Sequence, residues 1–400
     1  MNNRKCRSII TAIFIIMSVG CAGHPRHPVP VEMMGKATLG DIPDTVRAYW
    51  SKDRGVHKVF QQDFIQSFRD ETSGYFPHRQ GGTQRYHGLA ISGGGANGAF
   101  GAGILCGWSD LGSRPRFKIV TGISTGALIA PYAFIGSDYD EKLKTMYTTM
   151  STKNIAKIKP PLPFNFDSVV DSKPLKNLID KEVDEKMLAD IASAHLNGQR
   201  LYIATTDLDA QRFVVWNVGA IAISNSPNAL TLIKDIMLAS ASIPGIFPPV
   251  YINVELNGQP YDEMHVDGGV FNQLFFTELL LDFREAAELF YVGDDSNHLG
   301  HLYVIRNGKV APEPQSIKST AFQISKRSLA TMIKVAAVKD THRLYNAAKD
   351  NHIDFNYIEI PNSYISESEE AIDRDEMNAL FNLGYLKARK NGFWIKEPFF

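Results

Sequence analysis

Residues 87–105 read HGLAISGGGANGAFGAGIL, a stretch that places a cluster of glycines directly after a short apolar run. Glycine weakens both helices and strands, so such a cluster indicates a backbone that turns sharply or lets another group approach closely. The apolar run has the length of a buried strand, and the small residues that follow Gly98 suit a helix packed close to a sheet. A unit of strand, loop and helix is typical of an α/β fold.

The glycine loop, residues 93–98, would aim successive backbone N–H groups at one point, next to the N-terminus of the following helix. Two anions suit such a loop. A pyrophosphate would make it a nucleotide site, but Asp110 follows too soon to be the acidic residue expected about twenty positions later. A transient oxyanion in a catalytic site is the second possibility. In a third interpretation the glycines bind nothing and only permit tight packing.

A second motif favours the oxyanion. KIVTGISTGALIA, residues 118–130, places Gly-x-Ser-x-Gly between an apolar strand and an apolar helix, which is the context of a nucleophile elbow. The serine in such an elbow sits on a strained turn that points its hydroxyl out of the sheet. Gly122 and Gly126 remove side chains that would collide there. The sequence therefore predicts Ser124 as a nucleophile.

A serine hydroxyl needs a base, and a third motif offers one. In MHVDGGVFNQ, residues 264–273, Asp267 precedes two glycines at the expected end of a strand. An Asp-Gly pair is also typical of a hairpin turn, so this pattern alone leaves turn and base open. His265 lies two residues earlier on the same expected strand face and is a second candidate partner of the serine.

Taken in this order, the three motifs resemble those of the patatin-like phospholipase family. Two further segments are similar to family elements, ASASIPGIFPPV at residues 239–250 and DSKPLKNLI at residues 171–179, so the resemblance spans roughly residues 86–272. By resemblance, the oxyanion loop is Gly93, Gly94, Gly95, Ala96, Asn97 and Gly98, the elbow is Gly122, Ser124 and Gly126, and the acid motif is Asp267, Gly268 and Gly269.

The resemblance implies a three-layer α/β/α sandwich with a mainly parallel central sheet, and a Ser124–Asp267 dyad that works without histidine. It implies a carboxylic ester hydrolase that acts on phospholipids, lysophospholipids or other acyl esters and needs no metal or organic cofactor. Family members commonly carry Arg or Lys at the position of Asn97. That charge is absent here, whereas the backbone donors remain and the Asn97 amide can still donate a hydrogen bond.

Other functions stay open from the residues alone. A Ser-His-Asp esterase needs a histidine after its acid, and four qualify by order: His298, His301, His342 and His352. A non-catalytic envelope lipoprotein would use the same fold for binding, and a nucleotide-binding protein would use the glycine loop for phosphate. The net charge of -1 disfavours a nucleic-acid partner, and no Cys/His spacing is typical of a metal site.

The N-terminal residues have the pattern of a targeting segment. Basic residues precede an apolar stretch, residues 9–19, that is too short to span a bilayer comfortably. SVGC, residues 18–21, resembles the lipobox of bacterial lipoproteins. We therefore expect a signal peptide over residues 1–20, lipidation of Cys21 and a place in the cell envelope. Ala22 is not the aspartate of an inner-membrane retention signal, which favours the outer membrane. Simple secretion is the alternative.

A chain of 400 residues with 44% hydrophobic and 21% charged positions can bury a sizeable core. We expect a tether and N-terminal extension over residues 21–85 with a helix at 56–70, a catalytic core over 86–310, and a C-terminal α/β extension over 311–400 packed on that core. The apolar, proline-rich segment 155–170 is either an acyl entrance or an ordinary surface loop. Apolar runs predict strands at 88–92, 117–124, 200–208, 212–218, 289–293, 301–308 and 355–361, and helices at 326–350 and 375–391.

Overall fold

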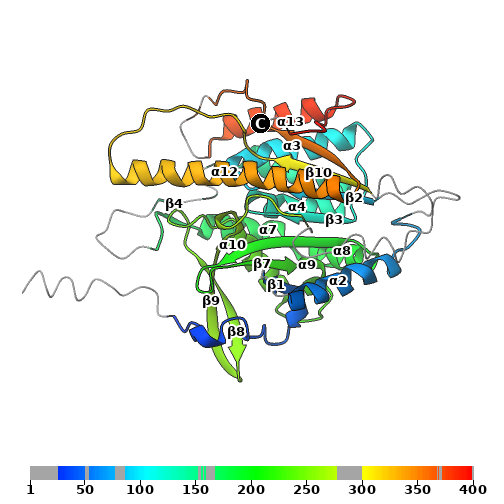
Figure 1. Cartoon of the computed structure of the whole chain (residues 1–400), viewed down its shortest axis with the longest axis vertical. Coiled ribbons are helices and arrows are strands. Elements are labelled where there is room, and N and C mark those ends of the chain that lie inside the picture. The colour runs from blue at the N-terminus through cyan, green and yellow to red at the C-terminus, as the bar shows by residue number, and fades with distance from the viewer. Residues whose placement is uncertain are drawn as a thin grey trace, which may run out of the picture.

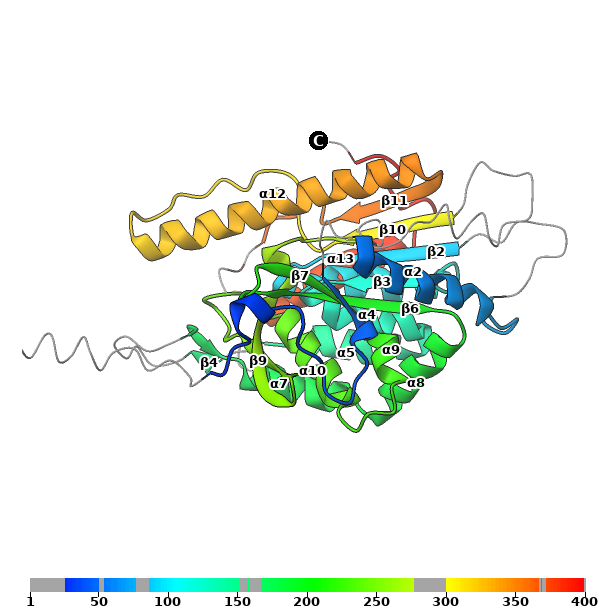
Figure 2. The same cartoon turned by 60° about the horizontal axis from the view of Figure 1, so that its bottom comes forward.

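The computed structural model describes residues 26–49, 54–76, 86–151, 155, 157–158, 167–276, 300–366, 368 and 372–398. The expected signal peptide, Cys21, His298 and the expected strand at 289–293 lie outside these residues, as does most of the segment 155–170. Within them, a mixed sheet carries helices on both faces (Figures 1 and 2). The chain is therefore an α/β protein, as the motifs predict.

The centre of the sheet is parallel. Its strands lie in the order β6-β3-β2-β10-β11 and all run in the same direction. Their bounds are β2 (Tyr86–Ile91), β3 (Ile119–Gly122), β6 (Arg200–Asp207), β10 (Gly300–Arg306) and β11 (Ile353–Glu359). An apolar run in the sequence predicts each of these strands, because a parallel strand is buried on both faces.

The rest of the sheet is antiparallel. It consists of β1 (Arg47–Tyr49), β7 (Arg212–Asn217), β8 (Val250–Leu256) and β9 (Gln259–Asp267). The four residues between β6 and β7 are too few for a crossover, so β7 must return antiparallel to β6. β8 and β9 form a hairpin whose turn holds Asn257 and Gly258 at φ values of 53° and 73°. An Asn-Gly turn of this hand matches the twist of the two strands.

Two buried clusters of apolar side chains lie on opposite faces of the sheet. The larger one packs most of the helices against one face, and the smaller one packs α2 (Arg54–Arg69) and the second half of α12 (Ala321–Asp350) against the other. The helices of the larger cluster are α3 (Gly98–Asp110), α4 (Thr125–Ile135), α5 (Asp140–Thr149), α7 (Lys173–Glu182), α8 (Glu185–Leu196), α9 (Val218–Ala222), α10 (Ala229–Ser240) and α13 (Arg374–Ala388). This is the sandwich that the sequence predicts.

Short elements complete the described chain. They are the 3-10 turns Val31–Met33, Asp44–Val46, Gly95–Asn97, Ser137–Tyr139 and Gly268–Val270, and the small sheet of β4 (Lys157–Ile158) and β5 (Val170–Asp171). None of the helices that the structure describes joins enough length with enough apolar character to cross a bilayer. The helix expected at 326–350 begins earlier, at Ala321. The Thr320 side chain accepts the N–H of Gln323 and thereby caps the N-terminus of the helix.

The small residues of α3 serve a second helix as well as the sheet. A Cβ atom on Gly103 would lie 2.1 Å from the carbonyl oxygen of Phe381, and one on Gly107 would lie 2.3 Å from that of Tyr385. Both partners belong to α13, which packs beside α3 in the same buried cluster. The glycine-rich run 98–107 therefore lets α3 approach α13 closely.

Candidate active site

The ends of β3 and β9 meet beside β6. β3 pairs with the first half of β6, as far as Gly122 opposite Ile203, and β9 pairs with the second half, where Asp267 lies opposite Thr205. The two strands approach this point from opposite directions, because β3 is parallel and β9 antiparallel to β6. The chain leaving β3 carries Ser124, so the sheet itself brings Ser124 and Asp267 together.

Ser124 lies on a strained turn between β3 and α4. Its φ of 56° and ψ of -126° are unusual for a residue other than glycine. A Cβ on Gly122 would lie 2.3 Å from the carbonyl oxygen of Gly126, and a Cβ on Gly126 would lie 2.2 Å from that of Ile91. No side chain fits at either position, which is the steric role that the elbow motif gives to its glycines.

A hydroxyl from α10 holds this turn in place. The backbone N–H of Ser124 donates to Oγ of Ser240 over 3.0 Å, and that hydroxyl donates to the carbonyl oxygen of Ala204 over 2.7 Å. Ser240 is fully buried and ties the elbow to β6. The only signal for Ser240 in the sequence is its place in the family-like segment 239–250, which assigns it no role of its own.

Asp267 is buried beside the serine. Its Oδ1 accepts the N–H of Gly269 over 2.7 Å, and the Ser124 side chain is close enough for hydrogen bonding to lower the pKa of the carboxyl. Burial raises the pKa of the Asp267 carboxyl from its usual 3.8 to about 7, although both hydrogen bonds act in the opposite direction. A Cβ on Gly268 would lie 2.6 Å from the carbonyl oxygen of Ala204, so this glycine lets the motif sit against β6.

The glycine loop runs past the serine with unpaired donors. The N–H of Gly93 donates to the carbonyl oxygen of Gln273 over 3.3 Å, and the N–H of Asn97 donates to that of Gly94 over 3.2 Å. For the N–H groups of Gly94 and Gly95, by contrast, no acceptor is found among the described residues. Both glycines are exposed, and Gly95 has a φ of 57°. Two backbone donors are thus available close to Ser124.

Close packing fixes the two ends of this loop. A Cβ on Gly94 would lie 2.1 Å from the carbonyl oxygen of Asn307, and one on Gly98 would lie 2.2 Å from Oγ1 of Thr125. Ala96 and Asn97 are half-buried. The loop is therefore held between the residue that follows β10 and the start of α4, with its middle open to solvent.

A cavity of about 470 Å³ contains the serine, the aspartate and the glycine loop. Apolar side chains line part of it, among them Leu329 and Ile333 of α12 and Leu380 of α13. Charged groups line another part: Arg306, Lys309, Glu313, Lys334 and Glu376. The sequence does not predict that α12 contributes to this site, because nothing in the pattern of the helix indicates which part of the sheet it crosses.

Asp340 joins α12 to the chain that follows the aspartate. Its Oδ2 accepts the N–H of Gln273 over 2.6 Å and that of Leu274 over 3.1 Å. This buried carboxylate fixes the helix beside the segment that leads away from Asp267. The apolar wall of the cavity therefore has a fixed place relative to Ser124.

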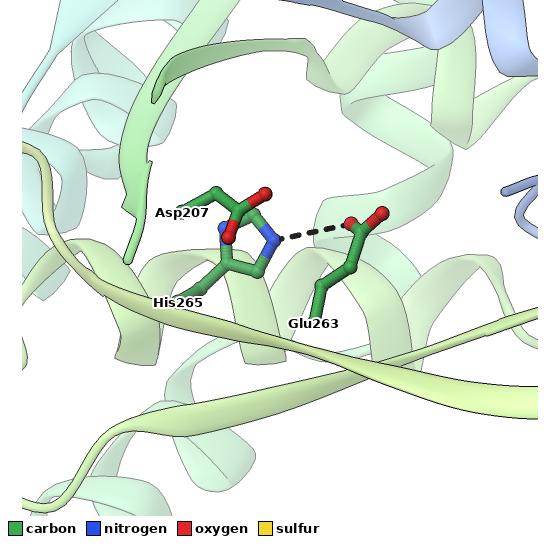
Figure 3. A group of neighbouring side chains, drawn as sticks. All are labelled: Asp207, Glu263 and His265. Carbon is green, nitrogen blue, oxygen red and sulfur yellow. Dashed lines mark hydrogen bonds and ion pairs between the residues drawn. The ribbon is translucent and has the colours of Figure 1, made fainter. Parts of the chain in front are cut away.

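The histidines lie apart from this arrangement. Nδ1 of His265 is 2.9 Å from Oγ1 of Thr205, and Nε2 is 3.4 Å from Oε2 of Glu263 (Figure 3). Both ring nitrogens are thus engaged away from Ser124. His301 pairs with Asp354 over 3.2 Å near the start of β10. Of the residues that line the cavity in the described part of the chain, none is a histidine.

Asp207, Glu263 and His265 form a buried group whose donor atoms lie within 4.8 Å of one another, close enough in principle to hold a metal ion (Figure 3). However, Nη1 of Arg47 is 2.7 Å from Oε2 of Glu263, the same oxygen that faces His265. Burial alone would raise the pKa of the Glu263 carboxyl. The pairing of Glu263 with His265 and Arg47 outweighs this effect, so the pKa lies below its usual value. Arg47 thus supplies the positive charge, and the group is best described as a buried ion-pair network.

Comparison with known proteins agrees with the motifs. A sequence model of the family described as patatin-like phospholipase matches residues 89–280. Among solved structures the chain is similar to VipD from Legionella pneumophila, with 14% identity, coverage of 76% of this chain and 66% of VipD, and a TM-score of 0.36. It is also similar to the type III effector protein ExoU, with 12% identity, coverage of 76% and 52%, and a TM-score of 0.34.

The chain thus spans just under two thirds of the VipD chain and about half of the ExoU chain. No curated protein matches it. The family match includes the glycine loop, Ser124 and Asp267, and a domain of this family implies lipid acyl hydrolysis in general terms. Residues 89–280 of this chain are accordingly a patatin-like phospholipase domain.

Proposed function

We propose that the chain is a serine acyl hydrolase that cleaves the carboxylic ester bonds of phospholipids, lysophospholipids or related lipids, with Ser124 as nucleophile and Asp267 as base. One observation carries this proposal. A buried carboxylate lies close enough to a serine on a strained turn for hydrogen bonding to lower its pKa, inside a cavity that also holds unpaired backbone N–H groups. Nucleophile, base and oxyanion donors are the three parts that acyl transfer requires.

In the first step Oγ of Ser124 attacks the carbonyl carbon of the ester, and Asp267 accepts the hydroxyl proton. The negative charge that develops on the carbonyl oxygen is stabilised by the N–H groups of Gly94 and Gly95. The tetrahedral intermediate then collapses. The ester C–O bond breaks, Asp267 gives its proton to the leaving alcohol, and an acyl group remains on Ser124.

The second step repeats this chemistry with water. Asp267 takes a proton from the water molecule, whose oxygen attacks the acyl carbon. The bond to Oγ of Ser124 breaks, the serine recovers a proton from Asp267, and the fatty acid leaves. A pKa of about 7 suits Asp267 for both directions of transfer, because a general acid–base works best with a pKa near the operating pH.

The cavity suits an amphipathic ester. Its apolar side chains on α12 and α13 can contact an acyl chain, whereas Arg306, Lys309 and Lys334 give it positive groups that suit a phosphate. Asn97 also lines the cavity. In this proposal its amide and the backbone donors carry the oxyanion stabilisation that a basic residue shares in other members of the family.

We also propose that residues 1–20 are a signal peptide and that lipidation of Cys21 anchors the enzyme in the bacterial envelope, in the outer membrane. This rests on the SVGC motif and on Ala22 after the cysteine. An anchored enzyme would meet its lipid substrates at the membrane surface.

A comparison of two matched substitutions tests the proposed base. Asp267→Asn keeps the shape of the side chain but removes the basic oxygen, so kcat/KM for a p-nitrophenyl ester should fall by a factor of about a hundred to ten thousand. His265→Gln keeps a polar group beside Thr205 and Glu263 and should cost far less. Asp138→Asn, on the surface, controls for the loss of a negative charge.

The pH profile extends the same experiment. Because Asp267 acts as a base only when it is ionised, we expect kcat/KM to rise with pH and to reach half its maximum near the pKa of Asp267, about 7. It expects the same profile in His265→Gln. If His265→Gln proves the more damaging variant, or if it abolishes the pH dependence, the reaction uses a histidine triad and the proposed dyad is wrong. If none of the proteins hydrolyses an ester, the domain has a binding role instead.

A further inference from the structure

The first half of α12 stands off the body of the protein. Among residues 321–336 no described side chain is buried, whereas in the second half Ala337, Asp340, Thr341, Leu344 and Ala348 are buried. Figures 1 and 2 both show this end of the helix, drawn in yellow-orange, reaching past the strands of the sheet. About four turns of helix are thus presented to the surroundings.

One face of this overhanging part is apolar and exposed. The exposed fractions are 51% for Ile324, 62% for Met332 and 45% for Val335. At about 100° per residue, these three side chains lie within about 80° of one another around the helix. We call them the outer face of α12. A group of large apolar side chains on a projecting helix marks an interaction site more often than a scattered single residue does.

The charge of the same region has one sign. Residues 314–339 contain Lys318, Lys326, Arg327, Lys334 and Lys339, and no Asp or Glu. Lys334 pairs with Glu313 over 2.7 Å. The exposed lysines 318, 326 and 339 have no acidic partner in the part of the chain that the structure describes. Of these lysines, Lys339 lies on the side of the outer face. Exposed apolar side chains in a region of unpaired positive charge fit a surface that is both apolar and anionic.

The other side of the helix reaches the candidate active site. Leu329, Ala330 and Ile333 of α12 line the cavity that contains Ser124 and Asp267. The outer face and the cavity wall therefore belong to the same few turns of helix. A surface that held the outer face would therefore lie one helix diameter, roughly 10 Å, from the cavity wall.

We propose that the outer face of α12 docks on an anionic lipid bilayer, with Ile324, Met332 and Val335 in the interfacial region and Lys339, on the same side of the helix, near the lipid phosphates. A second copy of the chain is a poorer occupant, because it would bring the same unpaired lysines against each other. The inference goes beyond the proposed hydrolysis and does not depend on it, since docking requires no reaction.

Vesicle sedimentation tests the docking directly. The parent protein for this test is the full chain with Cys21→Ser, so that no lipid anchor contributes, and with Ser124→Ala, so that no lipid is consumed. It is mixed with vesicles of phosphatidylcholine alone or of phosphatidylcholine with phosphatidylglycerol. We expect the mixed vesicles to bind the parent at least tenfold more tightly than the neutral ones, and high salt to release it.

Two sets of substitutions locate the contact. Ile324→Ser, Met332→Ser and Val335→Ser combined should weaken binding at least tenfold. Lys339→Gln should weaken it by about fivefold on anionic vesicles and leave binding to neutral vesicles unchanged, whereas Lys326→Gln, on the opposite side of the helix, should weaken it less. Far-UV circular dichroism and the thermal midpoint show whether each variant keeps the parent fold.

A matched triple variant is the control. Leu196, Leu386 and Val169 are 60%, 59% and 47% exposed, close to the values on the outer face, and lie elsewhere in the fold. Their replacement by serine should leave binding unchanged. The proposal is overturned if the parent does not bind anionic vesicles or if the outer-face triple variant binds them as tightly as the parent does. It is overturned as well if the control triple variant loses as much vesicle binding as the outer-face triple variant. It is also overturned if the parent is a dimer that the outer-face triple converts to a monomer.

The same triple, made with Ser124 intact, separates this inference from the proposed function. It should hydrolyse a soluble short-chain ester at the rate of the unsubstituted chain. Hydrolysis without vesicle binding would refute only the docking site. Vesicle binding in a chain that cleaves no ester would refute only the proposed hydrolysis.

Discussion

Asn in place of Asp267 should stabilise the folded protein at neutral and alkaline pH while it removes the proposed base. Burial raises the pKa of this carboxyl from 3.8 to about 7. One pKa unit corresponds to about 1.4 kcal/mol, so ionising Asp267 in the folded protein costs about 4 kcal/mol more than in the unfolded chain. A neutral amide of the same shape avoids this cost.

The effect has a defined pH window. Below about pH 4 the carboxyl is protonated in both states, and no cost arises. As the pH rises from about 4 to about 7 the unfolded chain loses its proton first, so the free energy of unfolding of the wild type falls. Above about pH 7 the difference is constant. Asp267→Asn should therefore gain nothing at low pH and up to about 4 kcal/mol at pH 8, less about 1 kcal/mol for a weaker bond to Ser124.

Urea unfolding of wild type and Asp267→Asn at a series of pH values between about 5 and 8 measures this difference. Asp138→Asn, at an exposed carboxyl, controls for the general effect of charge. The expected result is a stability gain for Asp267→Asn that grows with pH. If the two proteins keep the same difference at every pH, the carboxyl is not held at a raised pKa and the electrostatic reasoning fails.

Three further substitutions probe the site and the anchor. Gly126→Ala would place a Cβ 2.2 Å from the carbonyl oxygen of Ile91, so it should lower the thermal midpoint and kcat/KM together; an unchanged protein would contradict the elbow geometry. Ser240→Ala leaves the buried N–H of Ser124 without its acceptor. It should lower the free energy of unfolding by about 1–3 kcal/mol and also lower kcat. Wild-type values for both quantities would show that this hydroxyl does not hold the turn. Cys21→Ser should move the protein from the membrane to the soluble fraction after a high-salt wash, and continued pelleting would exclude lipidation as the anchor.

The parts of the site that sequence could predict are those with a local steric cause. Gly122 and Gly126 admit no Cβ, and the loop around Gly94 needs close approach to Asn307, so both requirements leave glycines in the sequence. Gly122 and Gly126 therefore have the steric role in the elbow that the sequence predicts. The roles of Ser124 and Asp267 as nucleophile and base stay predictions until a reaction is measured.

The parts that sequence could not predict depend on which strands and helices become neighbours. The meeting of β3 and β9 beside Ala204 is a matter of register, and no local pattern states it. The hydrogen bond from Ser124 to Ser240 joins residues 116 positions apart. The hairpin turn at Asn257 and Gly258 was legible in the sequence and would have shown that this part of the sheet is antiparallel.

Labelling with a fluorophosphonate tests whether Ser124 is the nucleophile. The reagent is added to wild type, to Ser124→Ala and to the control Ser193→Ala. Mass spectrometry then gives the mass of each intact protein. We expect one adduct on wild type and on Ser193→Ala, mapped to the peptide that contains Ser124, and no adduct on folded Ser124→Ala. An adduct on Ser124→Ala equal to that on wild type would place the nucleophile elsewhere and refute the proposed role of Ser124.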